Sequence, residues 1–188
     1  MTTNRLISFL HLLGVKYTTS FSGKYFAAHP HKYNLFGLSS MLSDYKINNA
    51  GIKVSDKNDI TIIETPFIAH IGSDFAIVER IENSNIYFVE GGKKIKTTID
   101  EFLKMWTGYT LIAEVDGDSI EPNYKLNFQK ELFHNISKIS VLAISAFLVM
   151  LGIIYTNSYK SLAVMFLLII SLIGIYWSFT NIEATLIT

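Results

Sequence analysis

The side chains available for chemistry are hydroxyls, carboxylates and histidines, because the 188-residue sequence contains no cysteine. A chain without cysteine has no thiol nucleophile, no disulfide and no thiolate metal ligand. His29 and His31 flank Pro30, and two closely spaced histidines can contribute to a metal site. No second pair with ligand spacing accompanies them, so we expect no metal and no cofactor. His70 lies in an apolar stretch and is expected to be a core or hydrogen-bonded residue.

Charge and composition exclude two further classes of function. The formal net charge is +0 and the sequence pI is about 7.0, whereas a protein that follows a phosphate backbone needs clustered Lys and Arg. We therefore expect no nucleic-acid partner. The sequence also has no glycine-rich phosphate-binding motif, so no ATP site is expected. Gly91 and Gly92 are interpreted as a hairpin turn.

Hydrophobic periodicity predicts an α+β domain over residues 1–120, with helices first and an antiparallel sheet after them. The start of the chain predicts an amphipathic helix with Leu6, Ile7, Phe9, Leu10 and Leu13 on or near its buried side. The other predicted helices are 18–30, 34–47 and 99–106, and the predicted strands are 51–54, 67–71, 74–81, 85–90, 94–98 and 109–116. Residues 57–63 are compatible with a short helix or a strand.

The C-terminal part of the sequence has a different composition. After a linker at 121–138, residues 139–188 are expected to form a two-helix transmembrane hairpin. The segments 139–155 and 162–179 carry no charged residue, and each has about the length that crosses a bilayer as a helix. The alternative is a pair of buried helices in a soluble protein.

The distribution of lysines predicts an orientation for this hairpin. Lys125, Lys130 and Lys138 precede the first segment, and only Lys160 lies in the short link between the two. The positive-inside rule then places the N-terminal domain in the cytoplasm.

Three segments of the predicted domain resemble the peptidase C39 domain, the papain-like cysteine peptidase found ahead of bacteriocin-exporting ABC transporters. They are "HPHKYNLFGLSSMLSDYKINNAGIKV" (29–54), "TPFIAHIGSDFAIVERI" (65–81) and "TTIDEFLKMWTGYTLIAE" (97–114). In order and at these distances, they extend the resemblance from about Leu6 to Glu114. The resemblance implies a papain-like fold and a bacterial inner-membrane location.

The resemblance also identifies the positions at which the family carries its catalytic residues. The cysteine at the start of the second helix corresponds to about Thr18, Thr19 or Ser20, and the histidine corresponds to Asp74. The third member, normally an Asp, corresponds to Glu90. The resemblance therefore implies a degenerate site that lacks both the nucleophile and the base.

The alternative interpretation of these positions is a hydrolase that uses a hydroxyl group as its nucleophile. Ser20 or a neighbouring threonine would need a base that is active near neutral pH, usually imidazole. Asp74 is a poor substitute, because an ordinary carboxyl group has a pKa of about 4. We therefore expect Thr18–Ser20 to cap a helix, and we expect the chain as it stands not to be an enzyme.

Three functions remain open at this point. A degenerate C39-like domain is expected to bind a peptide or partner protein in a transport or thiol-redox assembly, held at a membrane by its tail. The C-terminal stretch also resembles the first helix of a vitamin K epoxide reductase-like domain, a thiol oxidoreductase whose cysteines would lie beyond this chain. The third possibility is a membrane-anchored protein with a role limited to assembly.

Overall fold

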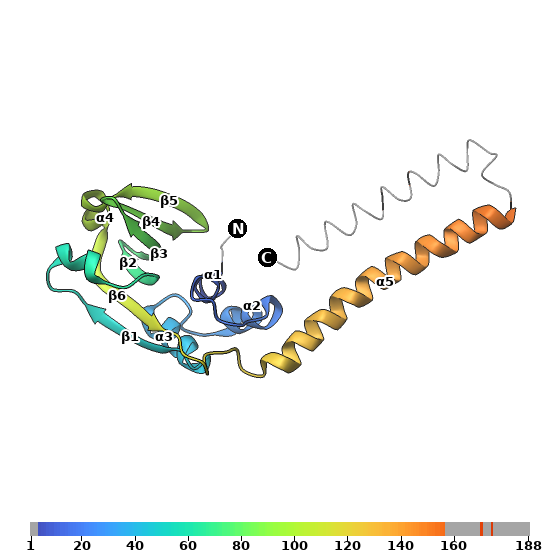
Figure 1. The fold of residues 1–188 in the computed structure, drawn as a ribbon, viewed down its shortest axis with the longest axis horizontal. Helices are drawn as coiled ribbons and strands as arrows, with labels where there is room; N and C mark the ends of the chain where they lie inside the picture. Colours follow the sequence, from blue (N-terminus) through green and yellow to red (C-terminus); the bar gives the residue numbers. More distant parts are fainter. Residues whose placement is uncertain (1–3, 157–169, 171–173, 175–188) are drawn as a thin grey trace. The chain divides into compact units, whose positions relative to one another are not determined.

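The computed structural model describes residues 4–156, 170 and 174. The chain forms two compact units, Met1–Glu131 and Leu132–Thr188. The first unit contains helices and a sheet in the order predicted from the sequence (Figure 1). It extends beyond the predicted domain end at residue 120 and includes the first residues of the predicted linker.

Three helices open the first unit: α1 (Arg5–Leu12), α2 (Thr19–Ala28) and α3 (Leu35–Asp44). Asn34 caps α3 by accepting a hydrogen bond from the backbone N–H of Gly37 at 2.7 Å, as its position in the sequence predicts. Gly37 has a steric reason to be glycine, because an added Cβ would lie 1.9 Å from the carbonyl oxygen of His31. The loop between α2 and α3 therefore packs directly on the first turn of α3.

Six antiparallel strands form one sheet in the order β1-β6-β2-β3-β4-β5 (Figure 1). Their bounds are β1 Asn48–Lys53, β2 Phe67–Ile71, β3 Asp74–Glu82, β4 Asn85–Glu90, β5 Lys93–Thr98 and β6 Trp106–Glu114. Residues 57–63, which the sequence left open between a short helix and a strand, contain a short 3-10 helix, η1 (Lys57–Ile62). The helix α4 (Ile99–Met105) connects β5 to β6. The strands β1 and β6 each begin three residues earlier than predicted, at 48 and 106 instead of 51 and 109.

The core lies on both faces of this sheet, because alternate residues of a strand point to opposite faces. Phe75 and Ile77 of β3 contact the layer of α1, α2 and α3, which includes buried Leu6, Phe9 and Leu10. Ala76 and Val78 contact the opposite layer, which includes Ile60, Phe102 and Trp106. The first half of β3 is therefore covered on both sides, as its continuous apolar run predicts.

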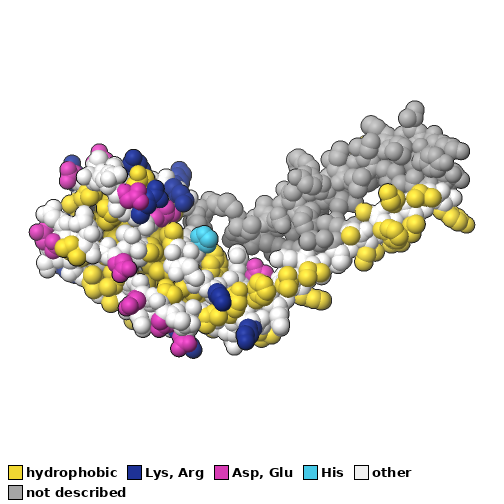
Figure 2. Space-filling view, in the orientation of Figure 1, with side chains coloured by type: hydrophobic (Ala, Val, Ile, Leu, Met, Phe, Trp, Pro, Cys, Tyr) yellow, Lys and Arg dark blue, Asp and Glu magenta, His cyan; other side chains and the backbone are white. Residues whose placement is uncertain are grey.

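The residues after the sheet differ from the prediction. The predicted linker and the predicted first span are not separate elements, since Tyr124–Thr156 form one 33-residue helix, α5. Exposed apolar side chains follow its second half (Figure 2), among them Ile144, Phe147, Leu148, Leu151 and Ile154.

Within the described residues, no helix combines the length and the apolar character needed to cross a membrane. This finding corrects the expectation of a separate membrane-spanning helix over 139–155, whose residues continue a helix that starts in the polar segment before them. The expected second span, 162–179, lies outside the described residues except for residues 170 and 174.

Candidate functional site

The N-terminus of α2 is the position at which the resemblance places a nucleophile, and here it binds a carboxylate of the same chain. Thr18 precedes the helix and is buried, with 3% of its surface exposed. Its backbone N–H donates to Glu121 Oε2 at 2.6 Å, and its hydroxyl donates to Glu121 Oε1 at 2.8 Å. The Thr18 side chain makes no capping bond to the helix. The end of the helix is instead stabilised by Glu121, because the partial positive charge at a helix N-terminus favours an anion.

Two more side chains complete the surroundings of Glu121. The hydroxyl of Ser22 donates to Glu121 Oε2 at 3.0 Å, and the amide of Asn127 donates to Glu121 Oε1 at 3.0 Å. A hydrogen bond of 2.7 Å joins the hydroxyls of Ser22 and Tyr45. Glu121 is only 1% exposed, and a carboxylate can remain in such a place only when hydrogen bonds replace its water. We call Thr18, Ser22, Tyr45, Glu121 and Asn127 the Glu121 cluster.

Backbone contacts fix the position of Glu121 in the first unit. Its N–H donates to the carbonyl of Lys16 at 3.1 Å, and the N–H of Ile120 donates to the carbonyl of Tyr45 at 2.9 Å. The amide of Asn127 also donates to the carbonyl of Pro122 at 3.0 Å. The segment after the sheet therefore returns to α2 and α3. The sequence offered no signal for this, because a single acidic residue in a polar stretch has no periodic pattern.

The pKa values of Tyr45 and of its neighbour Tyr25 are both raised. Burial raises the pKa of Tyr45 well above its usual range, and the negative charge of Glu121 raises it further. Burial likewise raises the pKa of Tyr25, and a hydrogen bond to Asp44 acts in the same direction. Both phenols therefore remain protonated at neutral pH.

The predicted hydroxyl positions Thr19 and Ser20 lie in the first turn of α2 and are exposed. The N–H of Ser20 is 3.4 Å from Glu131 Oε2, which adds a second carboxylate to this end of the helix. No hydrogen bond among the described residues joins either hydroxyl to Asp74.

Asp74 and Glu90 occupy the predicted places at the start of β3 and the end of β4. These strands are antiparallel neighbours, with Ile77 opposite Val89, so the two acidic residues lie at the same end of the strand pair. Asp74 forms an ion pair with Arg5 of α1. Glu90 lies opposite Lys93 across the Gly91–Gly92 turn, where both glycines have positive φ.

The histidines have structural contacts. The Nδ1 atom of His70 is 2.8 Å from the hydroxyl of Thr107, which confirms the prediction of a hydrogen-bonded histidine. The Nδ1 atom of His29 accepts a hydrogen bond from the N–H of His31 at 3.2 Å. In the part of the chain that the structure describes, no group of three or more His, Cys, Asp or Glu residues could hold a metal ion.

In this domain helices precede an antiparallel sheet, which places it in the α+β class. The arrangement is compatible with a papain-like fold. Residues 10–117 match the peptidase C39 family. Since this stretch is more than half of the sequence, the chain belongs to the peptidase C39 family. The match agrees with the range expected from the quoted segments.

The chain is also similar to solved structures, and the first of the two reported below supports the same fold. A double glycine motif protease from an AMS/PCAT transporter, solved in complex with the leader peptide, has a TM-score of 0.52 and 16% sequence identity over 59% of this chain and 81% of that chain. The peptidase domain of Streptococcus ComA, a bifunctional ABC transporter involved in quorum sensing, has a TM-score of 0.49 and 16% identity over 59% and 88%. No curated protein matches the sequence significantly. The vitamin K epoxide reductase-like context stays a prediction.

Proposed function

We propose that this chain is a non-catalytic C39 domain that binds a peptide or a partner protein. The observation that carries the proposal is the buried Glu121 carboxylate at the N-terminus of α2. A nucleophile at this helix end would gain reactivity from the helix dipole, but here the dipole already stabilises a carboxylate. Thr18 is buried and donates its hydroxyl proton to that carboxylate, so a substrate carbonyl has no access to its oxygen.

The residue at the histidine position supports the same proposal. Asp74 forms an ion pair with Arg5 of α1, so its carboxylate already has a partner in the fold. No hydrogen bond among the described residues places it against a hydroxyl that it could deprotonate, and a general base must lie within hydrogen-bond reach of the proton that it removes. Among the described residues, no hydrogen bond joins the hydroxyl of Thr19 or Ser20 to a base that could remove its proton.

The binding half of the proposal rests on the fold. The similar protease from the AMS/PCAT transporter was solved with a leader peptide bound, and a domain of the same fold that loses its catalytic residues can retain the capacity to bind. We therefore propose an extended peptide, presented by a transport or thiol-redox partner, as the ligand class.

A labelled peptide tests both halves of the proposal. The probe is a fluorescein-labelled synthetic peptide with an amphipathic segment that ends in Gly-Gly. We expect saturable binding by the full chain in fluorescence anisotropy, with the peptide intact by mass spectrometry after prolonged incubation. Cleavage that Asp74→Ala abolishes would overturn the non-catalytic assignment. Absence of saturable binding up to about 100 μM, a Kd worth roughly 5.5 kcal/mol, would overturn the binding assignment.

A matched pair of variants locates the binding surface. Ser73→Trp places a large ring beside Asp74, where Ser73 is exposed in the β2–β3 turn. Lys104→Trp places the same ring at an exposed position of α4. We expect only Ser73→Trp to weaken peptide binding, and equal effects of the two variants would argue against a surface near Asp74.

The apolar C-terminal part supports a second element of the proposal, attachment of the domain to a membrane. Ile144, Leu148 and Leu151 of α5 are each exposed, and apolar surface of this kind gains free energy when it leaves water. The triple variant Ile144→Lys/Leu148→Lys/Leu151→Lys should release the full chain from membranes in an alkaline carbonate wash. A control triple of exposed apolar residues in the first unit, Ile62→Lys/Met105→Lys/Tyr109→Lys, should remain bound.

A further inference from the structure

The first turns of α5 have an apolar side and a polar side. The apolar side carries five exposed side chains, Leu126, Phe128, Leu132, Phe133 and Ile136, with exposed fractions of 51%, 47%, 48%, 75% and 54%. Because a helix turns by about 100° per residue, these five positions fall within an arc of about 160°. They therefore form one apolar stripe along the helix, and we call these five residues the apolar stripe of α5.

The polar side of the same turns is the side that contacts the first unit. The amide of Asn127 donates to Glu121 Oε1 and to the carbonyl of Pro122, each at 3.0 Å. Glu131, four residues later, accepts a hydrogen bond from the N–H of Ser20 at 3.4 Å. Residues four apart share one side of a helix, and this side lies opposite the apolar stripe. A surface helix ordinarily packs its apolar side inward, so the start of α5 is oriented the opposite way.

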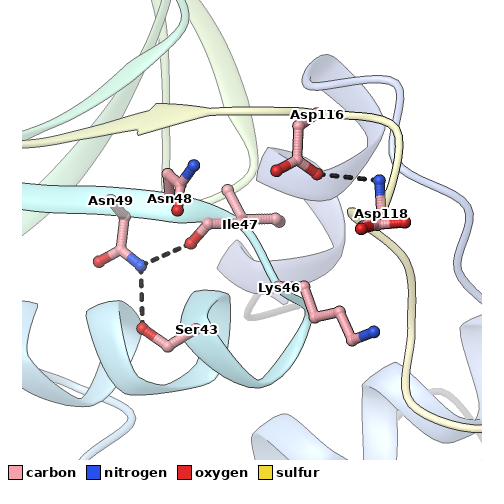
Figure 3. Close-up of a pocket in the computed structure, with 7 residues that line it drawn as sticks. All are labelled: Ser43, Lys46, Ile47, Asn48, Asn49, Asp116 and Asp118. Carbon is pink, nitrogen blue, oxygen red and sulfur yellow. Dashed lines mark hydrogen bonds between the residues drawn. The ribbon is translucent and has the colours of Figure 1, made fainter.

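The connection between β6 and α5 fixes this orientation. The hydroxyl of Ser119 donates to the carbonyl of Lys46 at 2.9 Å, and the N–H of Ile120 donates to the carbonyl of Tyr45 at 2.9 Å. Figure 3 shows the beginning of this connection, which lines a polar hollow together with residues of α3 and β1. Together with the bonds to Glu121, these contacts hold the first turn of α5 in place. The apolar stripe cannot turn inward without breaking them.

We propose that the apolar stripe lies against the surface of a lipid bilayer, so that the first turns of α5 form a membrane-surface helix. This inference rests on the membrane attachment proposed above for the second half of α5. An amphipathic helix at a membrane surface places its apolar side about 5–10 Å into the boundary between headgroups and acyl chains. Because Asn127 joins these turns to Glu121, the first unit is then held at one orientation to the bilayer.

Two observations favour a bilayer over a protein partner. The helix continues without a break into residues 144–154, where further apolar side chains are exposed, so a membrane that takes up those residues also lies next to the stripe. Between residues 124 and 138 the sequence has three lysines and one acidic residue, which favours an anionic surface. Lys125 and Lys130 are exposed, and such side chains reach lipid phosphates while their methylene groups cover apolar surface.

Site-directed spin labelling of the full chain tests the orientation, because the native chain has no cysteine and each label reports on one position. The vesicles contain equal parts of phosphatidylcholine and phosphatidylglycerol. Oxygen, which concentrates in lipid, and a nickel chelate, which stays in water, serve as relaxing agents. Two matched pairs compare the sides of the helix, Phe128→Cys with Lys130→Cys and Ile136→Cys with His134→Cys. Residues two apart point to nearly opposite sides at almost the same height along the helix.

We expect the nickel chelate to relax the labels of Phe128→Cys and Ile136→Cys at least about threefold less than those of Lys130→Cys and His134→Cys, because only the apolar stripe enters the bilayer. All four native side chains are exposed, so labelling should leave the urea stability of the chain unchanged. Equal nickel accessibility of the four labels would overturn the proposal. Labels of Phe128→Cys and Ile136→Cys shielded from oxygen as well as nickel would overturn it in favour of a protein partner.

A label in the second half of α5 separates failure of this inference from failure of the proposed attachment. Leu151 is exposed there, and the label of Leu151→Cys should be accessible to oxygen and shielded from nickel. If it is, while Phe128→Cys and Ile136→Cys are open to nickel, only the membrane-surface helix is overturned. A label of Leu151→Cys that is open to nickel would overturn the membrane attachment and this proposal with it.

The lipid composition tests the role of the lysines. Replacing phosphatidylglycerol with phosphatidylcholine should raise the nickel accessibility of Ile136→Cys about twofold, because Lys125 and Lys130 lose their anionic partners. Adding Lys125→Gln/Lys130→Gln to Ile136→Cys should produce the same rise on the mixed vesicles. Nickel accessibility that changes in neither experiment would overturn the assignment of these lysines to headgroup phosphates.

Discussion

The N-terminus of α2 and the start of β3 are the two places at which the resemblance to C39 peptidases predicts a nucleophile and a base, and the carboxylates found there have different surroundings. At α2, Glu121 is 1% exposed and has four donors, the Thr18 N–H, the Thr18 hydroxyl, the Ser22 hydroxyl and the Asn127 amide. At β3, Asp74 has 44% of its side chain exposed and forms an ion pair with Arg5.

This difference separates a structural site from a surface site. A buried carboxylate and its donors depend on one another, because removing either partner leaves buried polar groups unsatisfied. A half-exposed ion pair gains little, since water and salt replace much of the lost interaction. The carboxylate at the start of α2 therefore contributes to stability, whereas we expect substitutions of Asp74 at the start of β3 to cost little stability.

The largest expected effect comes from removing the buried carboxylate. Glu121→Ala leaves the donors of Thr18, Ser22 and Asn127 without an acceptor, and we expect a loss of about 3 kcal/mol or more in the free energy of unfolding. Urea denaturation measures it. The control is Glu131→Ala, whose 3.4 Å contact lies at the surface and should change stability by less than about 0.5 kcal/mol.

A single thiol probes the electrostatics of the same helix end. In Thr18→Cys, burial and the adjacent Glu121 carboxylate both disfavour a thiolate, so the thiol pKa should lie above its ordinary value of about 8.5. The exposed Thr19→Cys lacks both effects and should have the lower pKa. The pH dependence of alkylation by iodoacetamide gives both values. A lower pKa for Thr18→Cys would show that the helix dipole dominates over Glu121.

Tyr45→Phe removes the hydroxyl that bonds Ser22 and should cost about 1 kcal/mol at neutral pH. The wild-type phenol also has a raised pKa, chiefly because it is buried. The folded state therefore holds this proton more tightly than the unfolded chain, so the contribution is complete below about pH 10 and is lost as the pH rises above it.

Denaturation at a series of pH values tests that sign. Between about pH 10 and 11, the usual range for an unfolded tyrosine, the wild-type chain should lose stability more steeply than Tyr45→Phe. Parallel stability curves for the two chains would contradict the assignment of Tyr45 as the titrating group.

The smallest expected effect on stability comes from changing Asp74 at the start of β3. Asp74→Asn removes the charge that pairs with Arg5, and the free energy of unfolding should fall by less than about 1 kcal/mol. The loss should shrink further in 1 M salt, because the screening length falls to about 3 Å. A loss as large as that of Glu121→Ala would remove the distinction between the two sites.

Most of the fold could be predicted from local patterns. The amphipathic spacing of Leu6, Phe9 and Leu10 and the N-cap at Asn34 predicted helices that the structure contains. Within the sheet the errors lie at the boundaries, where β1 and β6 extend further than their apolar residues indicate. The larger error lies after the sheet, where the predicted linker and first span form one helix, α5. Cross-strand hydrogen bonds define a strand, and polar residues such as Asn48 take part in them without any hydrophobic signal.

The candidate site could be predicted only in part. Asp74 and Glu90 were located by their places relative to two strands, and the structure puts both at one end of that strand pair. Glu121 was missed, because it is separated from Thr18 by 103 positions. Contacts over such distances depend on how the chain returns to itself, which no local pattern encodes.

The sequence by itself determined the absence of a thiol, the order of helices and strands, and the membership of the C39 family. Composition and periodicity are local properties, and each residue expresses them without reference to distant ones. Only the tertiary structure decided which carboxylate binds the end of α2 and in which order the strands form the sheet. Both depend on long-range packing, because Glu121 can accept the hydrogen bonds of Thr18 only after folding has brought the two residues together in a buried place.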